Sequence, residues 1–168
     1  MSTLLDFYLG TGVDSRGRTF GEILAFSDED LERVHDWVQW LFPLPEPSYW
    51  NPDAPLLTPE DLTAFRKPDV GSSEKTYAEW TCLHTNVGRA WGRYSQFLRD
   101  TKKWMRPGDH NHLRITRALR FLTLTGNGRK ARLLHNYCLS PAVEFSGETR
   151  WYWEEALKEN PAYLRRDP

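Results

Sequence analysis

The chain has 168 residues, a formal net charge of −1, and 39% hydrophobic and 14% aromatic residues. This length predicts one domain over residues 1–168, large enough to bury a core of its own. The near-neutral charge excludes a global attraction to nucleic acid or to an acidic membrane.

Cysteine usage and the chain start indicate an intracellular, cytoplasmic protein. Cys82 and Cys138 lie far apart among apolar residues, which is typical of reduced thiols and not of a disulfide framework. The first residues show no signal peptide, and no run approaches the roughly 20 apolar residues of a membrane span.

The charged residues are distributed unevenly along the chain. Residues 1–98 hold 15 acids and 8 bases, whereas residues 99–132 hold 10 bases and 2 acids. Charge is therefore separated along the sequence: residues 1–98 are acidic overall, and residues 99–132 are basic.

The first part of the chain predicts three short elements. Residues 2–9 favour a short helix or strand, and Thr19 with Glu22 predicts a capping box at the start of a helix. The next helix is expected to begin after the cap Ser27 and to end before Pro43. Its apolar stripe has helical spacing and comprises Leu31, Val34, Val38 and Leu41, flanked by Trp37 and Trp40.

A proline-rich stretch at residues 43–58 predicts an ordered loop, because flexible linkers are polar and free of aromatics. Thr58 followed by Pro59 marks the start of another helix. A long central helix is then expected over about residues 73–104. Its sustained apolar seam contains Tyr77, Trp80, His84, Val87, Trp91, Tyr94 and Leu98.

The remaining chain predicts three more helices. The first is capped by Asp109 or Asn111 and ends at Leu124. The second covers residues 129–139, and the third begins after the cap Ser146. The fold class is therefore all-α, with about seven helices around the long central one.

Candidate catalytic and metal groups are few. Asp109, His110 and His112 invite a metal interpretation, but alternating helical side chains diverge by about 200°, so a capping loop is favoured. An enzyme of unrecognised type would use His35 or His110 with a neighbouring carboxylate, yet no nucleophile stands in a triad-like context. We expect no enzyme activity, no metal and no cofactor.

Basic residues between 99 and 132 suggest an anion-binding face. The alternatives are a solvated face, or pairing with the acids near Asp28. Trp104 would suit stacking on a base or an aromatic side chain. In this interpretation the face contains Trp104, His110, Arg114 and Arg117, and its partner is a nucleic acid or another polyanion.

Aromatic residues around the proline-rich stretch suggest a second surface. Trp37, Trp40, Tyr49 and Trp50 flank a rigid extended segment and are predicted to bind an aromatic peptide. The alternative is a core role, in which residues 35–48 brace the N-terminal helices against the long central helix.

Residues 35–47, with the sequence HDWVQWLFPLPEP, resemble the signature of the opioid growth factor receptor conserved-domain family. Further pieces resemble that family in the same order: residues 54–58 (APLLT), 86–90 (NVGRA) and 110–117 (HNHLRITR). The resemblance runs from about residue 6 to residue 145.

The resemblance implies an all-α fold and a receptor for an enkephalin-type pentapeptide, with nuclear and perinuclear locations. It implies no individual binding residue. We therefore predict a non-enzymatic recognition domain that binds a short peptide or a protein segment, with nucleic-acid binding and an unrecognised enzyme as alternatives.

Overall fold

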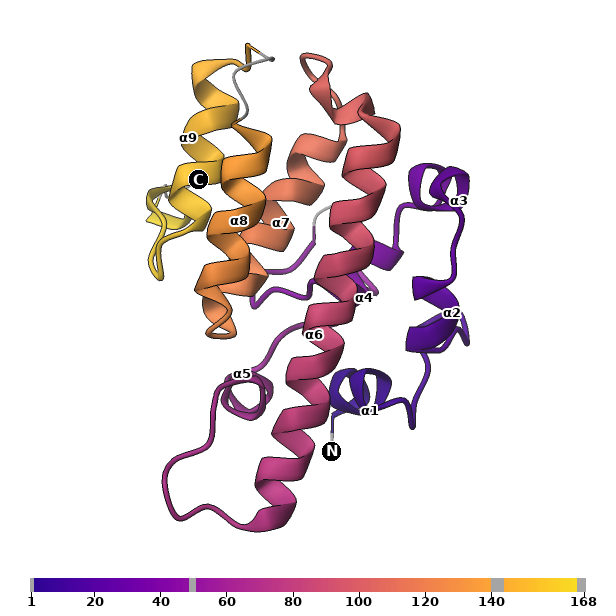
Figure 1. Cartoon of the computed structure of the whole chain (residues 1–168), viewed down its shortest axis with the longest axis vertical. Helices are drawn as coiled ribbons and strands as arrows, with labels where there is room; N and C mark the ends of the chain where they lie inside the picture. Colours follow the sequence, from indigo (N-terminus) through magenta and orange to yellow (C-terminus); the bar gives the residue numbers. More distant parts are fainter. Residues whose placement is uncertain (1, 49–50, 140–143, 166–168) are drawn as a thin grey trace. The chain divides into compact units, whose positions relative to one another are not determined.

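The computed structural model describes residues 2–48, 51–139 and 144–165. Those residues form helices and turns, with no β-strand among them beyond an isolated bridge between Leu44 and Leu56. The all-α prediction is therefore confirmed. The elements are α1 (Thr3–Leu9), α2 (Phe20–Leu24), α3 (Asp28–Arg33), α4 (Trp37–Leu41), α5 (Pro59–Phe65), α6 (Glu74–Thr101), η1 (Lys103–Met105), α7 (Asn111–Leu124), α8 (Gly128–Cys138), α9 (Gly147–Ala156) and η2 (Ala162–Arg165) (Figure 1).

Local sequence signals place the helix starts. Thr19 and Thr58 each complete a capping box, and Ser27 and Ser146 each accept a hydrogen bond from the backbone N–H three residues later. The long central helix is confirmed as α6. These starts were predictable because a cap involves residues only three positions apart.

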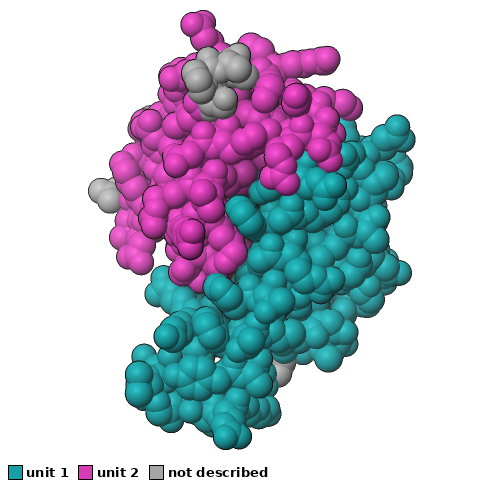
Figure 2. All heavy atoms as spheres, in the orientation of Figure 1, with its two compact units in different colours: residues 1–97 teal, residues 98–168 magenta. Residues whose placement is uncertain are grey.

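The chain divides into two compact units, residues 1–97 and residues 98–168 (Figure 2). The boundary falls inside α6, after Phe97. The expectation of one domain over residues 1–168 stays a prediction, and each unit is described separately below.

The core of the first unit is built from aromatic side chains. Phe7 of α1 lies edge-on to Phe20 of α2 and to Trp40 of α4, with ring centroids 5.5 and 5.1 Å apart. Tyr8 contacts Phe65 of α5 at 4.9 Å. Four short helices thereby bury one continuous aromatic surface.

The segment at residues 35–48 braces this unit against α6, as predicted. Trp37 and Phe42 lie 5.8 and 5.4 Å from Tyr94 of α6, measured between ring centroids. Arg93 of the same helix donates to the Phe26 carbonyl at 2.7 Å and to Asp28 at 2.8 Å. Apolar and charged contacts therefore hold the same part of α6.

The second unit packs α8 and α9 against α7 (Figure 1). Trp104 stacks on Phe145 with centroids 5.7 Å apart, and Phe145 lies 4.9 Å from Trp153 of α9. The indole of Trp153 donates to the His112 carbonyl at 3.2 Å. The buried side chains of α7 and α8 include Ile115, Ala118, Leu119, Leu122, Ala131, Leu134 and Cys138.

Both cysteines are free thiols. Cys138 is buried, and this burial raises the pKa of its thiol, whereas Cys82 is half-buried. The thiol of Cys138 is therefore a poor nucleophile at neutral pH.

Candidate functional site

The single helix expected between Ser27 and Pro43 is interrupted, and this corrects the sequence prediction. Helix α3 ends at Arg33, Val34 is extended with φ −86° and ψ 127°, and α4 begins only at Trp37. The apolar spacing continues through the break, so the pattern gave no sign of it.

Tertiary contacts explain why the break is stable. The indole N–H of Trp37, whose side chain is fully buried, donates to the Leu31 carbonyl at 3.0 Å, satisfying a group near the end of α3. The interruption also places the Asp36 carboxylate beside two guanidinium groups, those of Arg16 at 2.6 Å and Arg18 at 3.1 Å. Hydrogen bonding and ion pairing thus replace the helical hydrogen bonds that the break removes.

A buried carboxylate anchors the same network. The side chain of Asp14 is 0% exposed, and its carboxylate pairs with Arg18 at 2.5 Å. It also accepts from the backbone N–H groups of Arg16 and Arg18, at 2.9 and 2.8 Å. Burial lowers the pKa of Arg18, but hydrogen bonds to Asp14 and Asp36 outweigh it, so the pKa is raised overall.

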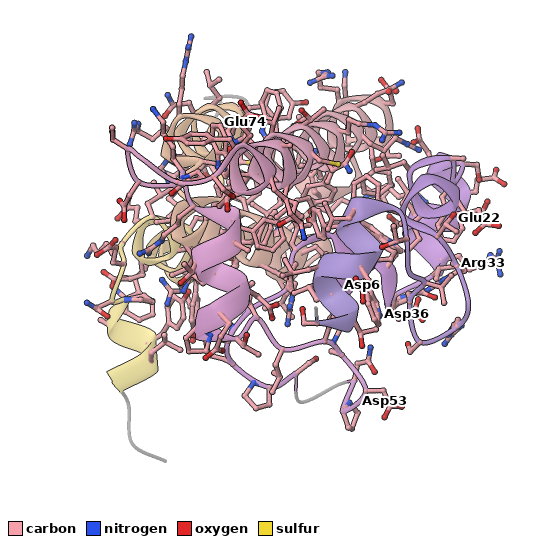
Figure 3. The ribbon with its side chains drawn as sticks, turned by 90° about the horizontal axis from the view of Figure 1, so that it is seen from below. Asp6, Glu22, Arg33, Asp36, Asp53 and Glu74 are labelled. Atoms are coloured by element: carbon pink, nitrogen blue, oxygen red, sulfur yellow. The ribbon has the colours of Figure 1, made fainter. Side chains whose placement is uncertain are left out.

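This break forms one wall of a polar cleft with a volume of about 540 Å³. Its lining comes from the turn before α2, the α3–α4 break and the turn before α5. The lining residues are Ser15, Arg16, Arg33, Val34, His35, Asp36, Gln39, Asn51 and Asp53. Arg33, Asp36 and Asp53 are labelled in Figure 3, which views the molecule from below.

The charges of the cleft are mixed. Two arginines, Arg16 and Arg33, and two carboxylates, Asp36 and Asp53, line it. Arg33 is also paired with Asp30 at 2.7 Å, but its side chain is 76% exposed, so that pair is well solvated. The Gln39 amide, oriented to satisfy its hydrogen bonds, donates to the Asp36 carbonyl at 2.8 Å and stiffens the wall.

The two described tryptophans of the predicted aromatic surface lie in the core and not at the cleft. Trp37 and Trp40 are 0% and 4% exposed and contact other core rings, so neither contributes to the cleft. Tyr49 and Trp50 lie outside the described residues. Trp104 is also fully buried, which removes its ring from any stacking surface in the folded unit.

The predicted basic face is divided. Arg114 is buried and donates to Asn111 at 3.1 Å, whereas Arg117 is half-buried and His110 is exposed at the start of α7. Arg120, another base of the 99–132 run, is also buried and donates to the carbonyls of Lys158 and Glu159 at 2.9 and 2.8 Å. The interpretation of this run as one anion-binding face is therefore corrected for Arg114 and Arg120, whose guanidiniums satisfy acceptors inside the second unit.

The predicted metal motif is a capping turn. The Asp109 carboxylate accepts from the backbone and side-chain nitrogens of Asn111, at 2.9 and 2.8 Å. The Nε2 atom of His112 lies 2.7 Å from the Trp104 carbonyl. Asp109 therefore forms a turn at the start of α7, while the N-cap residue His110 makes no side-chain capping hydrogen bond; His112 belongs to the core.

Several cleft residues were not singled out from the sequence, namely Ser15, Arg16, Arg33 and Asp53. The turn at residues 14–18 was recognisable, but its pairing with Asp36 joins residues about twenty positions apart in sequence. No local pattern encodes such a pair.

Comparison with protein families gives a match over residues 5–80 to the opioid growth factor receptor (OGFr) conserved region. The matched segment, residues 5–80, is called the OGFr region below. The matched segment includes the HDWVQWLFPLPEP signature and every residue that lines the cleft. The resemblance at residues 86–90 and 110–117 falls outside the match and stays a prediction.

Comparison with the curated proteins and with the solved structures found no match. Among the described residues, no helix is both long enough and apolar enough to cross a bilayer. The OGFr region is therefore defined by sequence similarity, whereas the cleft within it is defined by the structure.

Proposed function

We propose that the OGFr region is a non-enzymatic recognition module that binds a short peptide or a protein segment in the cleft. The observation that carries the proposal is the position of the cleft: the OGFr match contains its whole lining. Two of its three wall segments, the turn at residues 14–18 and the α3–α4 break, are tied together by the Asp14, Arg18 and Asp36 network, so this part of the site is preformed.

The lining suits a polypeptide main chain. Ser15, Gln39 and Asn51 supply neutral polar groups, while Arg33 and Asp53 supply charges of opposite sign. The volume of about 540 Å³ lies within the ordinary range for ligand sites, and an extended peptide advances about 3.4 Å per residue. The cleft is therefore large enough for a few residues of an extended chain.

The resemblance suggests an enkephalin-type ligand, which carries tyrosine and phenylalanine. Because Trp37 and Trp40 are core residues, the described lining binds the polar main chain and the charges of such a ligand. Recognition of aromatic side chains would then need groups outside that lining.

Isothermal titration calorimetry with a pentapeptide containing Tyr and Phe tests the proposal. We expect a saturating heat with the unmodified protein and at least a tenfold weaker affinity for Asp53→Asn combined with Arg33→Gln. The matched control is Glu60→Gln combined with Lys67→Gln, two exposed residues of the same unit outside the cleft. Absence of heat at millimolar peptide, or equal weakening by the control, would sink the proposal.

The enzyme alternative stays a prediction, since His35 lines the same cleft beside Asp36. Both Asp36 oxygens already face arginines, Oδ2 facing Arg16 and Oδ1 facing Arg18, which favours a positioning role for this carboxylate. Mass spectrometry of the peptide after prolonged incubation separates the two functions. Recognition leaves the peptide intact, whereas hydrolysis produces fragments that disappear in His35→Ala.

A further inference from the structure

Three aromatic side chains gather where α9 meets the short helix that follows it. Trp151 and Tyr152 belong to α9, and Tyr163 belongs to η2. The ring centroid of Tyr152 lies 4.9 Å from that of Trp151 and 5.5 Å from that of Tyr163, and the remaining pair is 6.3 Å apart. We call these three side chains the α9 aromatic cluster. It belongs to the second unit and lies outside the OGFr match.

The cluster is distinct from the core contacts of α9. Trp153 and Ala156 are fully buried and supply those contacts, whereas all three rings of the cluster are half-buried. Leu164, which follows Tyr163 in the chain, is 45% exposed. An apolar surface with aromatic rings at its centre therefore stays in contact with solvent.

The backbone that carries the cluster is held in place by a buried carboxylate. Glu155 of α9 accepts from the backbone N–H of Ala162 at 2.6 Å and also pairs with Lys158. Arg120 of α7 donates to the carbonyls of Lys158 and Glu159, in the turn between α9 and η2. The rings are thus presented on an ordered scaffold, so little of their freedom remains to be lost on binding.

The rings form a continuous surface and not an enclosure. At centroid separations of 4.9–6.3 Å they contact one another directly. An aromatic cage for a quaternary ammonium group would need a gap between the rings, so that the cation could approach the face of each. The cluster instead suits a ligand that lies across the rings.

A carboxylate lies beside this surface. Glu148 is exposed in the first turn of α9, three residues before Trp151 and four before Tyr152, and residues with this spacing are neighbours on a helix surface. Among the side chains that the structure describes, no lysine or arginine pairs with Glu148. Glu155, the next acid on this face, is already paired with Lys158. The surface therefore carries an available negative charge.

We propose that the α9 aromatic cluster and Glu148 bind a proline-rich segment of a partner protein that carries a lysine or arginine beside its prolines. Proline-rich segments form the polyproline II helix and pack on surfaces lined by aromatic side chains. Three half-buried rings offer a small contact area, so a ligand that is ordered before binding is favoured because it loses the least entropy. The basic residue complements the charge of Glu148.

The spacing of the surface defines the spacing expected in the ligand. Glu148 precedes the two rings of α9 by three and four residues, which is about 4.5–6 Å along the helix axis. A polyproline II helix repeats every three residues, or about 9 Å. A lysine three positions from a Pro-Pro pair therefore reaches the carboxylate through its own flexible side chain while the prolines contact the rings.

Fluorescence anisotropy with a labelled ten-residue peptide tests this inference. The peptide contains two Pro-Pro pairs three residues apart and a lysine three residues after the second pair. We expect saturable binding to the whole chain with a Kd below about 1 mM. Absence of saturation at that concentration would overturn the proposal, as would equal binding of a peptide in which alanine replaces every proline.

Substitutions at Tyr152 test the aromatic contact. Tyr152→Ala should weaken binding about tenfold, because it removes the central ring, whereas Tyr152→Phe should bind like the unmodified protein. Far-UV circular dichroism should show the same helix content in both variants. Unchanged binding by Tyr152→Ala would show that the cluster only packs η2 against α9, and would overturn the proposal.

A charge exchange tests the role of Glu148. Glu148→Gln should weaken binding of the lysine peptide about two- to fivefold and leave binding of a glutamine-substituted peptide unchanged. The matched control is Glu154→Gln, an equally exposed carboxylate of α9 whose charge acts on His135 of α8. Equal losses in the two variants would show attraction to overall charge and overturn the assignment.

The cleft of the OGFr region provides the last control. Asp53→Asn combined with Arg33→Gln alters that cleft and should leave binding of the proline-rich peptide unchanged. Loss of binding in this pair, with Tyr152→Ala unaffected, would place the peptide in the cleft and overturn the inference. The two sites can therefore fail independently of each other.

Discussion

Each unit contains a break between two helices, and the same kind of hydrogen bond lies beside both breaks. In the first unit, the indole of Trp37 donates to the Leu31 carbonyl, and in the second, the indole of Trp104 donates to the Leu98 carbonyl. Each acceptor lies six residues before its donor, and each tryptophan is fully buried. In both units a buried indole therefore donates to a carbonyl near a helix end; the Leu98 carbonyl also accepts from the Lys102 N–H at 3.3 Å.

The charges around the two breaks differ. At the first, Asp36 pairs with Arg16 and Arg18, and a polar cleft with charges of both signs results. At the second, Arg99, Lys102 and Arg106 are exposed. The same tryptophan contact thus supports the backbone at both breaks, while the pairing of the surrounding charges differs.

The largest expected effect comes from removing the shared contact. Trp37→Ala and Trp104→Ala should each reduce the free energy of unfolding by about 3–5 kcal/mol, because each deletes a fully buried indole. Urea denaturation followed by circular dichroism measures the loss. A change below about 1 kcal/mol in either variant would break the parallel between the units.

The next effect tests the ion network that is specific to the first break. Asp14→Asn should cost about 2–3 kcal/mol of unfolding free energy, since it leaves the half-buried Arg18 with a weakened partner. Asp69→Asn, at an exposed position, should stay within about 0.5 kcal/mol. If the two variants were equally stable, the network would not hold the cleft walls.

A smaller effect is expected for the buried arginine of the second unit. Arg120→Met should cost about 1–2 kcal/mol, because it removes hydrogen bonds to two carbonyls that water can partly replace. The exposed Arg150→Met is the control on α9. A stability gain in Arg120→Met would show that burying this guanidinium costs more than its hydrogen bonds return.

The smallest effect concerns the pH dependence of the second unit. Burial lowers the pKa of His135, partly opposed by Glu154. Below the usual pKa of 6.5 the unfolded chain takes up the proton first, so stability is lost as the pH falls through this window. His135→Leu should therefore lose less stability than the unmodified protein between pH 7 and pH 5.5, as measured by urea midpoints. An unchanged pH slope would contradict the assignment.

Interactions between residues close in the chain were predicted well. Thr19, Ser27, Thr58 and Ser146 mark helix starts, because a cap joins groups three residues apart. The long helix α6 and the inward residues of α7 and α8 follow from helical spacing in the same way.

The cleft was not predictable, because it forms at a helix break that the spacing of apolar residues does not reveal. Val34 has the sequence spacing of an apolar stripe with Leu31 and Leu41, but its backbone is extended and its half-buried side chain lines the cleft. The predicted roles of Trp37, Trp40 and Arg114 also depended on whether each side chain faces solvent or core. Spacing gives the face of a helix, but it does not say what covers that face.

The sequence by itself determined the all-α class, the helix starts, the OGFr resemblance and the uneven charge along the chain, since these are properties of residue types and short spacings. Only the tertiary structure decided that the helix after Ser27 breaks, that Asp36 meets Arg16 and Arg18, and that Arg120 faces inward while Lys102 faces solvent. Those outcomes depend on which distant groups can satisfy a buried carbonyl or charge, and that choice is made when the whole unit folds.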